Sequence, residues 1–173
     1  MNIYLIGMMA SGKSRVGRIL AARMKWPVLD LDQVIEERTG QSIKDLFEVH
    51  GESHFRALEF EAMQELLQMD NLIIATGGGT PCHHDLITKM IDTGLTIYLK
   101  ATPKVLAKRL MKDEVVRPLL TDLTPEAMED SLRELISKRK AVYERASYQV
   151  NANGSAEEVV VQIVKIVGGL QSK

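Results

Sequence analysis

The apolar residues of the chain fall into short continuous runs separated by longer stretches of mixed polarity. The runs at 3–6, 28–32, 72–76, 96–100 and 148–152 are predicted to be strands. Because such strands are apolar throughout, they are expected to be buried on both faces, as in a parallel sheet. The alternation of strands with helices predicts an α/β sandwich with right-handed crossover connections.

The intervening stretches carry sequence signals for the ends of helices. One helix is expected to begin at Ser42 and stop at Gly51, and another to begin at Thr124. A last helix is expected to begin at Ser155 and end at Gly168. Serine and threonine are favoured at the first position because their oxygen accepts a backbone N–H bond, and glycine is favoured just past the end.

The length of 173 residues predicts one domain over 1–173, and 45% hydrophobic and 26% charged residues are ordinary globular values. The net charge of -1 gives no electrostatic reason to expect nucleic acid or an acidic membrane as partner. No apolar run approaches the roughly 18 residues of a membrane helix. We therefore expect a soluble, cytoplasmic protein, in which the single Cys82 is a small buried side chain.

The stretch GMMASGKS matches the P-loop pattern G-x-x-x-x-G-K-[ST] in full, directly after a predicted strand and before an amphipathic helix. Its glycines let backbone amides wrap round phosphates at the start of the helix. Lys13 would reach the β and γ phosphates, and the Ser14 hydroxyl would bind Mg²⁺. The pattern predicts nucleotide phosphate binding rather than one reaction, with contacts from Gly7, Ala10, Ser11, Gly12, Lys13 and Ser14.

A carboxylate to accompany the P-loop is expected on a later strand. The strand at 72–76 instead runs into Gly77, Gly78 and Gly79, whereas the strand at 28–32 carries Asp30 and Asp32. Two residues apart on an extended strand, these aspartates would point to the same side. One could serve Mg²⁺ and the other a substrate hydroxyl, although a solvated strand end would also explain them.

Several motifs in order along nearly the whole chain resemble shikimate kinase. They are the P-loop, LDLDQVIEERTG, FRALE, ATGGG, RPLL and KRKAVYERA. The resemblance implies the nucleoside monophosphate kinase type of fold, with a five-stranded parallel sheet. It also implies a substrate-binding helical section at about 32–62 and a mobile lid at about 112–124. The implied reaction transfers a phosphoryl group from MgATP to shikimate, giving ADP and shikimate 3-phosphate.

The resemblance also implies a role for each matching residue. Arg56 and Arg139 would clamp the shikimate carboxylate, and Asp32 would accept hydrogen bonds from hydroxyl groups and orient the attacking one. Arg117, in the lid, would reach the transferring phosphate. The remaining implied contacts are to shikimate from Gly77, Gly78 and Gly79, to Mg²⁺ from Ser14 and, through water, Asp30, and to the α-phosphate from Arg15.

Two parts of the match differ from the family pattern or are weaker. The stretch KAVY after Arg139 lacks a proline that the family often has, which puts the alignment of Arg139 in question. On the adenine side, Arg109 is the candidate for stacking on the base, with Lys112 as the alternative. A solvated helix face is an equally good explanation for either residue.

Three other functions compete with the shikimate kinase interpretation. Another small-metabolite P-loop kinase, such as a gluconate kinase, would share the P-loop but not the combined LDLD, TGGG and RPLL motifs. A non-catalytic nucleotide-binding module would need a guanine-reading motif such as N-K-x-D, and a silent homologue would lack an expected charged residue.

A metal pair at His50 and His54 is disfavoured because Gly51 interrupts their helix. Nothing in the sequence demands more than a monomer.

Overall fold

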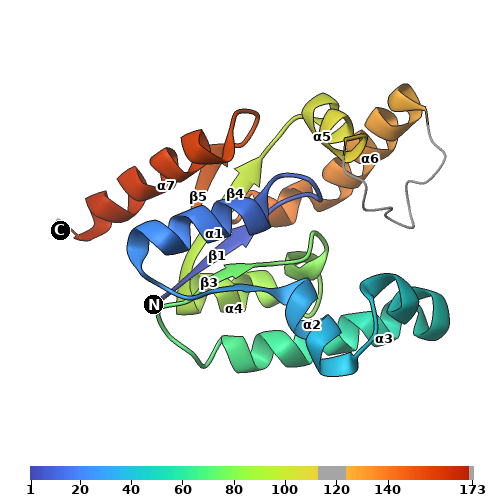
Figure 1. Cartoon of the computed structure of the whole chain (residues 1–173), viewed down its shortest axis with the longest axis horizontal. Helices are drawn as coiled ribbons and strands as arrows, with labels where there is room; N and C mark the ends of the chain where they lie inside the picture. The colour runs from blue at the N-terminus through green and yellow to red at the C-terminus, as the bar shows by residue number, and fades with distance from the viewer. Residues whose placement is uncertain (113–123, 172–173) are drawn as a thin grey trace.

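The computed structural model describes residues 1–112 and 124–171, which contain seven α-helices and five strands (Figure 1). The predicted lid at about 112–124 lies almost entirely outside these residues. The strands are β1 (Asn2–Ile6), β2 (Val28–Asp30), β3 (Ile73–Ala75), β4 (Gly94–Lys100) and β5 (Tyr148–Asn151). The helices are α1 (Lys13–Met24), α2 (Leu31–Thr39), α3 (Ile43–Leu66), α4 (Leu86–Thr93), α5 (Pro103–Leu110), α6 (Pro125–Tyr143) and α7 (Ala156–Gln171), with a 3-10 turn η1 (Thr80–Cys82).

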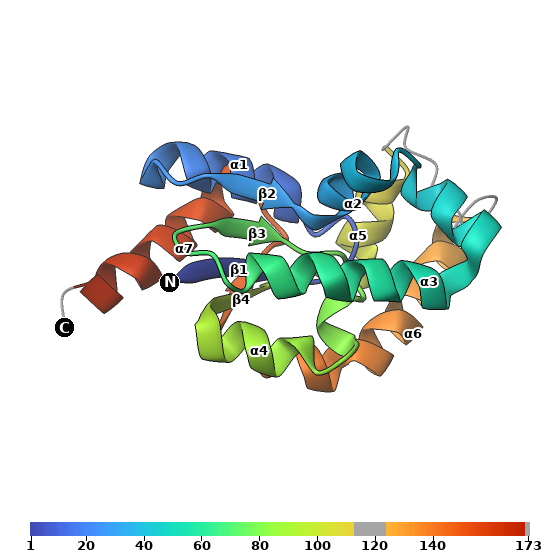
Figure 2. The same ribbon diagram turned by 90° about the horizontal axis from the view of Figure 1, so that it is seen from below.

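The strands form one parallel sheet in the order β2-β3-β1-β4-β5, which confirms the predicted architecture. Helix α1 lies on one side of the sheet and α4 on the other (Figure 2). Strand β1 is buried along its whole length. Its carboxyl end and that of β3 lie side by side, because Leu5 pairs with Ala75. The loops after these two strands, the P-loop and the glycine run, are therefore neighbours at the edge where such folds bind ligands.

The predicted strand at 28–32 is too long, and the inference that Asp30 and Asp32 share one side of a strand is wrong. Strand β2 ends at Asp30, whose backbone is extended and whose side chain accepts a hydrogen bond of 3.1 Å from the Asp32 backbone N–H. This is an N-cap, the position that starts a helix. Asp32 therefore lies in the first turn of α2, where carboxylates are favoured near the helix dipole.

The helix signals were correct at the starts and less so at the ends. Ser155 and Glu158 cap α7 reciprocally, with bonds of 2.8 and 3.2 Å. Gly51 has non-helical backbone angles (φ 79, ψ 170), but the chain resumes a helix at once, so α3 is two helical stretches joined at a kink. The prediction that α7 ends at Gly168 is wrong. That glycine does not adopt the left-handed conformation that ends a helix, and α7 continues to Gln171.

No helix within residues 1–112 and 124–171 is long and apolar enough to span a membrane.

Close packing between β1 and β4 makes a specific demand on Gly94, which pairs with Asn2. A side chain there would collide with the carbonyl oxygen of Asn2 and lie 2.9 Å from Cε2 of Tyr4. We expect Gly94→Ala to lower the free energy of unfolding by ~1–3 kcal/mol, because backbone cannot yield as a flexible side chain can. Urea denaturation measures this change. The control Gly169→Ala, where a Cβ meets nothing within 4 Å, should not destabilise the fold. Equal stability of the Gly94 variant and wild type would contradict the packing argument.

Candidate active site

The P-loop connects β1 to α1 and has the backbone that phosphate binding needs. Gly7 (φ 142) and Gly12 (φ 96) adopt angles that favour glycine, and a Cβ on Gly7 would lie 2.8 Å from the carbonyl oxygen of Leu99. Lys13 is only 8% exposed, and its ammonium donates to the carbonyls of Gly7 at 2.9 Å and Met8 at 2.8 Å. The Lys13 side chain thus folds back onto the P-loop, where it is predicted to bind the nucleotide phosphates.

A pocket of about 550 Å³ opens beside the P-loop. Among the residues that the structure describes, its walls include five cationic side chains and no acidic one, which favours a polyphosphate ligand. The lining residues are Ala10, Gly12, Lys13, Ser14, Arg15, Arg18, Arg109, Lys112, Gly154, Ser155 and Ala156. The predicted nucleotide residues Gly7 and Ser11 are buried in the loop behind this wall.

Sequence reasoning missed Arg18 and the segment 154–156 on the pocket wall. Arg18 lies one helical turn after Ser14, so the periodicity of α1 could have indicated it. The segment 154–156 is far away in the chain. Its capping box at Ser155 was recognised as a helix start, and a helix start after a strand of this sheet lies at the ligand-binding edge.

The predicted metal residues meet at this edge. The Ser14 hydroxyl donates a short hydrogen bond to Oδ2 of Asp30, while Oδ1 of the same carboxylate caps α2. A hydroxyl beside a carboxylate is a hard-oxygen donor set that suits Mg²⁺. Within the described ranges no three histidine, cysteine or acidic side chains gather as a metal cluster. Mg²⁺ commonly takes one or two protein oxygens and completes its shell with phosphate and water.

The turn after β3 is where charged side chains from α3 and α6 approach the backbone. A Cβ on Gly79 would lie 2.6 Å from Nη2 of Arg56, and a Cβ on Gly78 would lie 3.3 Å from Nη1 of Arg139. Both glycines have backbone angles that any residue can adopt. A side chain at Gly79 would displace the Arg56 guanidinium, and one at Gly78 would crowd that of Arg139.

The space beside Gly77 is likewise occupied by carboxylates. A Cβ on this residue would lie 2.7 Å from Oε1 of Glu59 and 3.2 Å from Oδ1 of Asp32. The preceding residue, Thr76, stands where many P-loop proteins carry an aspartate, and its hydroxyl donates to the carbonyl of Leu5 at 3.2 Å. The structure therefore brings the predicted residues Asp32, Arg56 and Arg139 to one short turn beside the P-loop.

Glu59 orients Arg56 and was not assigned a role from the sequence. Its buried carboxylate accepts a short bond from Nη1 of Arg56 and another from the hydroxyl of Thr80. Glu52 accepts from the same guanidinium at 3.0 and 3.2 Å. Burial opposes the charge of Arg56, but Glu59 and Glu52 outweigh it and raise the pKa of the guanidinium above its ordinary value. The i, i+3 spacing from Arg56 to Glu59 was the available signal.

Arg139 is placed by contacts that reach the P-loop. Its Nη1 lies 3.7 Å from the sulfur of Met8, and the Tyr143 hydroxyl donates to the carbonyl of Gly78 at 2.5 Å and lies 3.5 Å from the same sulfur. Burial is the largest influence on Tyr143 and raises the pKa of its phenol. The structure thus sets Arg139 beside the glycine turn even though the chain lacks the proline of the family pattern.

The adenine candidates and the lid arginine have different outcomes. Arg109 and Lys112 both line the pocket, and Lys112 is exposed. Arg117 lies outside the described residues. The rings of His50 and His54 lie with centroids 4.8 Å apart and a tilt of 46° between their planes, and no third ligand joins them in the part of the chain that the structure describes.

The buried partner of Arg56 should matter more to stability than the exposed one. We expect Glu59→Ala to lower the free energy of unfolding by about 2 kcal/mol or more, because it removes the buried acceptor that the largely buried guanidinium shares with the Thr80 hydroxyl. Glu52 has a side chain that is 61% exposed, so Glu52→Ala should cost under ~1 kcal/mol. Urea unfolding of the two variants compares them. Equal losses would contradict the assignment of Glu59 as the principal anchor.

Comparison with known proteins agrees with this arrangement. A family model described as shikimate kinase matches residues 9–167. The shikimate kinase of Aquifex aeolicus is 36% identical over 169 residues, which cover 98% of this chain and 97% of that protein. The crystal structure of shikimate kinase from Bacteroides thetaiotaomicron has a TM-score of 0.92 at 33% identity, covering 97% of this chain and 98% of that one.

A third relative was solved with a ligand. The shikimate kinase of Acinetobacter baumannii in complex with shikimate has a TM-score of 0.90 at 34% identity, covering 99% of this chain and 95% of that one. These matches and the five-stranded parallel sheet confirm the predicted P-loop kinase fold. The chain therefore belongs to the shikimate kinase family.

Proposed function

We infer that this member of the shikimate kinase family transfers the γ-phosphoryl group of ATP to the 3-hydroxyl of shikimate, and we propose how its residues do so. The observation that carries the assignment of roles is the convergence of Arg56, Arg139 and Asp32 on the glycine turn next to the P-loop. Two cations and one carboxylate match an acceptor that has a carboxylate at one end and hydroxyl groups at the other.

The acceptor is held by opposite charges at its two ends. Arg56 and Arg139 bind the shikimate carboxylate, since a guanidinium can offer it two parallel hydrogen bonds. Asp32 accepts hydrogen bonds from the ring hydroxyls. Gly77 and its neighbours let the ring approach the backbone because no side chain covers the turn. Glu59 keeps Arg56 in place, so the clamp is formed before the acceptor arrives.

The nucleotide lies in the cationic pocket beside the P-loop. Backbone amides of the loop and Lys13 bind its phosphates, and Arg109 or Lys112 lies against adenine. Ser14 would hold Mg²⁺, and Asp30, which accepts from the Ser14 hydroxyl, would contribute through water. The ion, when bound, neutralises charge on the β and γ phosphates.

Transfer forms a bond between the shikimate 3-oxygen and the γ-phosphorus and breaks the bond from that phosphorus to the bridging oxygen of ADP. Asp32 orients the attacking hydroxyl and takes its proton, while the bonding pair leaves with ADP. Lys13 and the lid residue Arg117 stabilise the charge of the transferring group. The lid also excludes water that would otherwise hydrolyse ATP.

Every group in this scheme belongs to one chain, so we propose that the monomer is active. We propose the cytoplasm, where MgATP is available, as its location. A gluconate kinase would share the P-loop but would not need the combined LDLD, TGGG and RPLL motifs. A non-catalytic nucleotide-binding module would not need them at all.

The direct test is ADP release from MgATP with shikimate, with gluconate and with no acceptor. We expect release only with shikimate, and a fall of at least ~100-fold in Asp32→Asn, because the amide cannot take the proton. The thermal midpoint of the variant controls for unfolding. Release that is independent of shikimate, or faster with gluconate, would overturn the assigned acceptor. Full activity of Asp32→Asn would overturn the role of that carboxylate.

A further inference from the structure

The side chain of Arg109 joins two loops that are far apart in the sequence. From the last turn of α5, Nη1 donates to the carbonyl of Ala10 at 3.2 Å and reaches that of Ser11 at 3.5 Å. Nη2 donates to the carbonyls of Ala152 and Gly154, both at 2.8 Å. One guanidinium therefore connects the P-loop to the β5–α7 loop, and residues of both loops line the nucleotide pocket.

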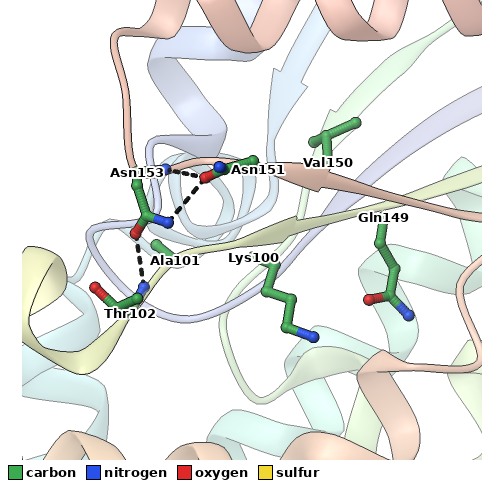
Figure 3. Close-up of a pocket in the computed structure, with 7 residues that line it drawn as sticks. All are labelled: Lys100, Ala101, Thr102, Gln149, Val150, Asn151 and Asn153. Carbon is green, nitrogen blue, oxygen red and sulfur yellow. Dashed lines mark hydrogen bonds between the residues drawn. The ribbon is translucent and has the colours of Figure 1, made fainter.

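The β5–α7 loop is a braced support for this link. The side-chain oxygen of Asn153 accepts from the backbone N–H of Thr102 at 2.9 Å, and Asn151 accepts twice from Asn153, at 2.8 and 3.0 Å (Figure 3). The backbone N–H of Ala152 donates to the carbonyl of Lys100 at 2.8 Å. The loop is thus tied to the end of β4 and to the first residue before α5, while Arg109 ties it to the last turn of that helix.

The P-loop side of the link needs such support. Ala10 has φ 59, a left-handed conformation that is unfavourable for a residue with a Cβ. Its carbonyl is one of the acceptors of Arg109, so the hydrogen bond stabilises the strained peptide. Within the loop, the backbone N–H of Ser11 bonds to the carbonyl of Met8 at 3.2 Å. Arg109 is the contact through which α5 supports this conformation.

The charge of Arg109 remains available to a ligand. Among residues 1–112 and 124–171 no carboxylate forms an ion pair with its guanidinium, and the partners given above are carbonyl oxygens. Burial lowers the pKa of Arg109 from its ordinary value, which still leaves it cationic at neutral pH. Among the described residues, carbonyl dipoles are the partners of this charge. Because Lys13 lines the same pocket, the two cations favour the binding of a polyphosphate there.

We propose that Arg109 is a positioning residue that fixes the P-loop against the β5–α7 loop and thereby sets the affinity of the pocket for the polyphosphate part of the nucleotide. This proposal rests on the proposed use of the pocket for ATP. Hydrogen bonds occupy the edge of a planar guanidinium, so a base could still stack on its face. This role and a stacking role differ in one consequence. If Arg109 positions the P-loop, its loss should also weaken the binding of ligands that have no base.

The test compares Arg109→Lys, which keeps the charge but cannot span both loops, with Lys108→Met, an exposed neighbour on the same helix. Binding of inorganic tripolyphosphate and of ATP, each with Mg²⁺, is measured by calorimetry, together with shikimate binding and the thermal midpoint. We expect Arg109→Lys to bind both phosphate ligands about tenfold more weakly, with a similar loss for each. Shikimate binding should stay within twofold, and Lys108→Met should resemble wild type.

Two results would overturn the proposal while leaving the ATP assignment intact. In one, Arg109→Lys loses ATP affinity but binds tripolyphosphate as wild type does, which identifies a role toward the base alone. In the other, tripolyphosphate and shikimate affinities fall together with the thermal midpoint, which identifies a general loss of structure. If wild type bound neither ATP nor tripolyphosphate, the assignment of the pocket itself would fail.

Discussion

The arrangement of the site depends on one steric constraint, the absence of side chains at Gly77, Gly78 and Gly79. A methyl group at any of the three would come within 3.3 Å of a charged side chain. Because none is present, α2, α3 and α6 can each bring a charged group to the carboxyl end of β3. The sheet register then places that turn next to the P-loop, since Leu5 pairs with Ala75.

Neighbouring side chains hold the charged groups at this turn in position. Glu59 holds Arg56, the Thr80 hydroxyl donates to Glu59, and the Tyr143 hydroxyl donates to the carbonyl of Gly78. The Met8 sulfur lies between Arg139 and the Tyr143 hydroxyl. Phosphoryl transfer requires alignment and charge more than covalent help from the protein. A site with its cations already in position therefore loses little conformational freedom when the substrates bind.

The sequence predicted the strands, the P-loop and the parallel architecture because these depend on local patterns of apolar residues and glycine. It did not predict that Asp32 lies on a helix, because the N-cap bond from Asp30 competes with the strand pattern of VLDLD. It also could not show that Arg109 reaches Ala152 and Gly154, since no local signal links residues more than forty positions apart. The family resemblance predicted the roles of Arg56 and Arg139. Only the three-dimensional packing shows that their guanidinium groups lie against the glycine turn.

The most direct test of this account is calorimetric titration of shikimate into Gly79→Ala, with Gly169→Ala as control. Gly79 has φ -90, so alanine fits the backbone and the change acts only through the space that Arg56 occupies. The account predicts that shikimate affinity falls by about tenfold or more, as expected when a charged hydrogen-bonding partner is displaced, while ATP affinity stays near wild type. Unchanged shikimate affinity in Gly79→Ala would contradict the claim that the glycine turn makes room for the clamp.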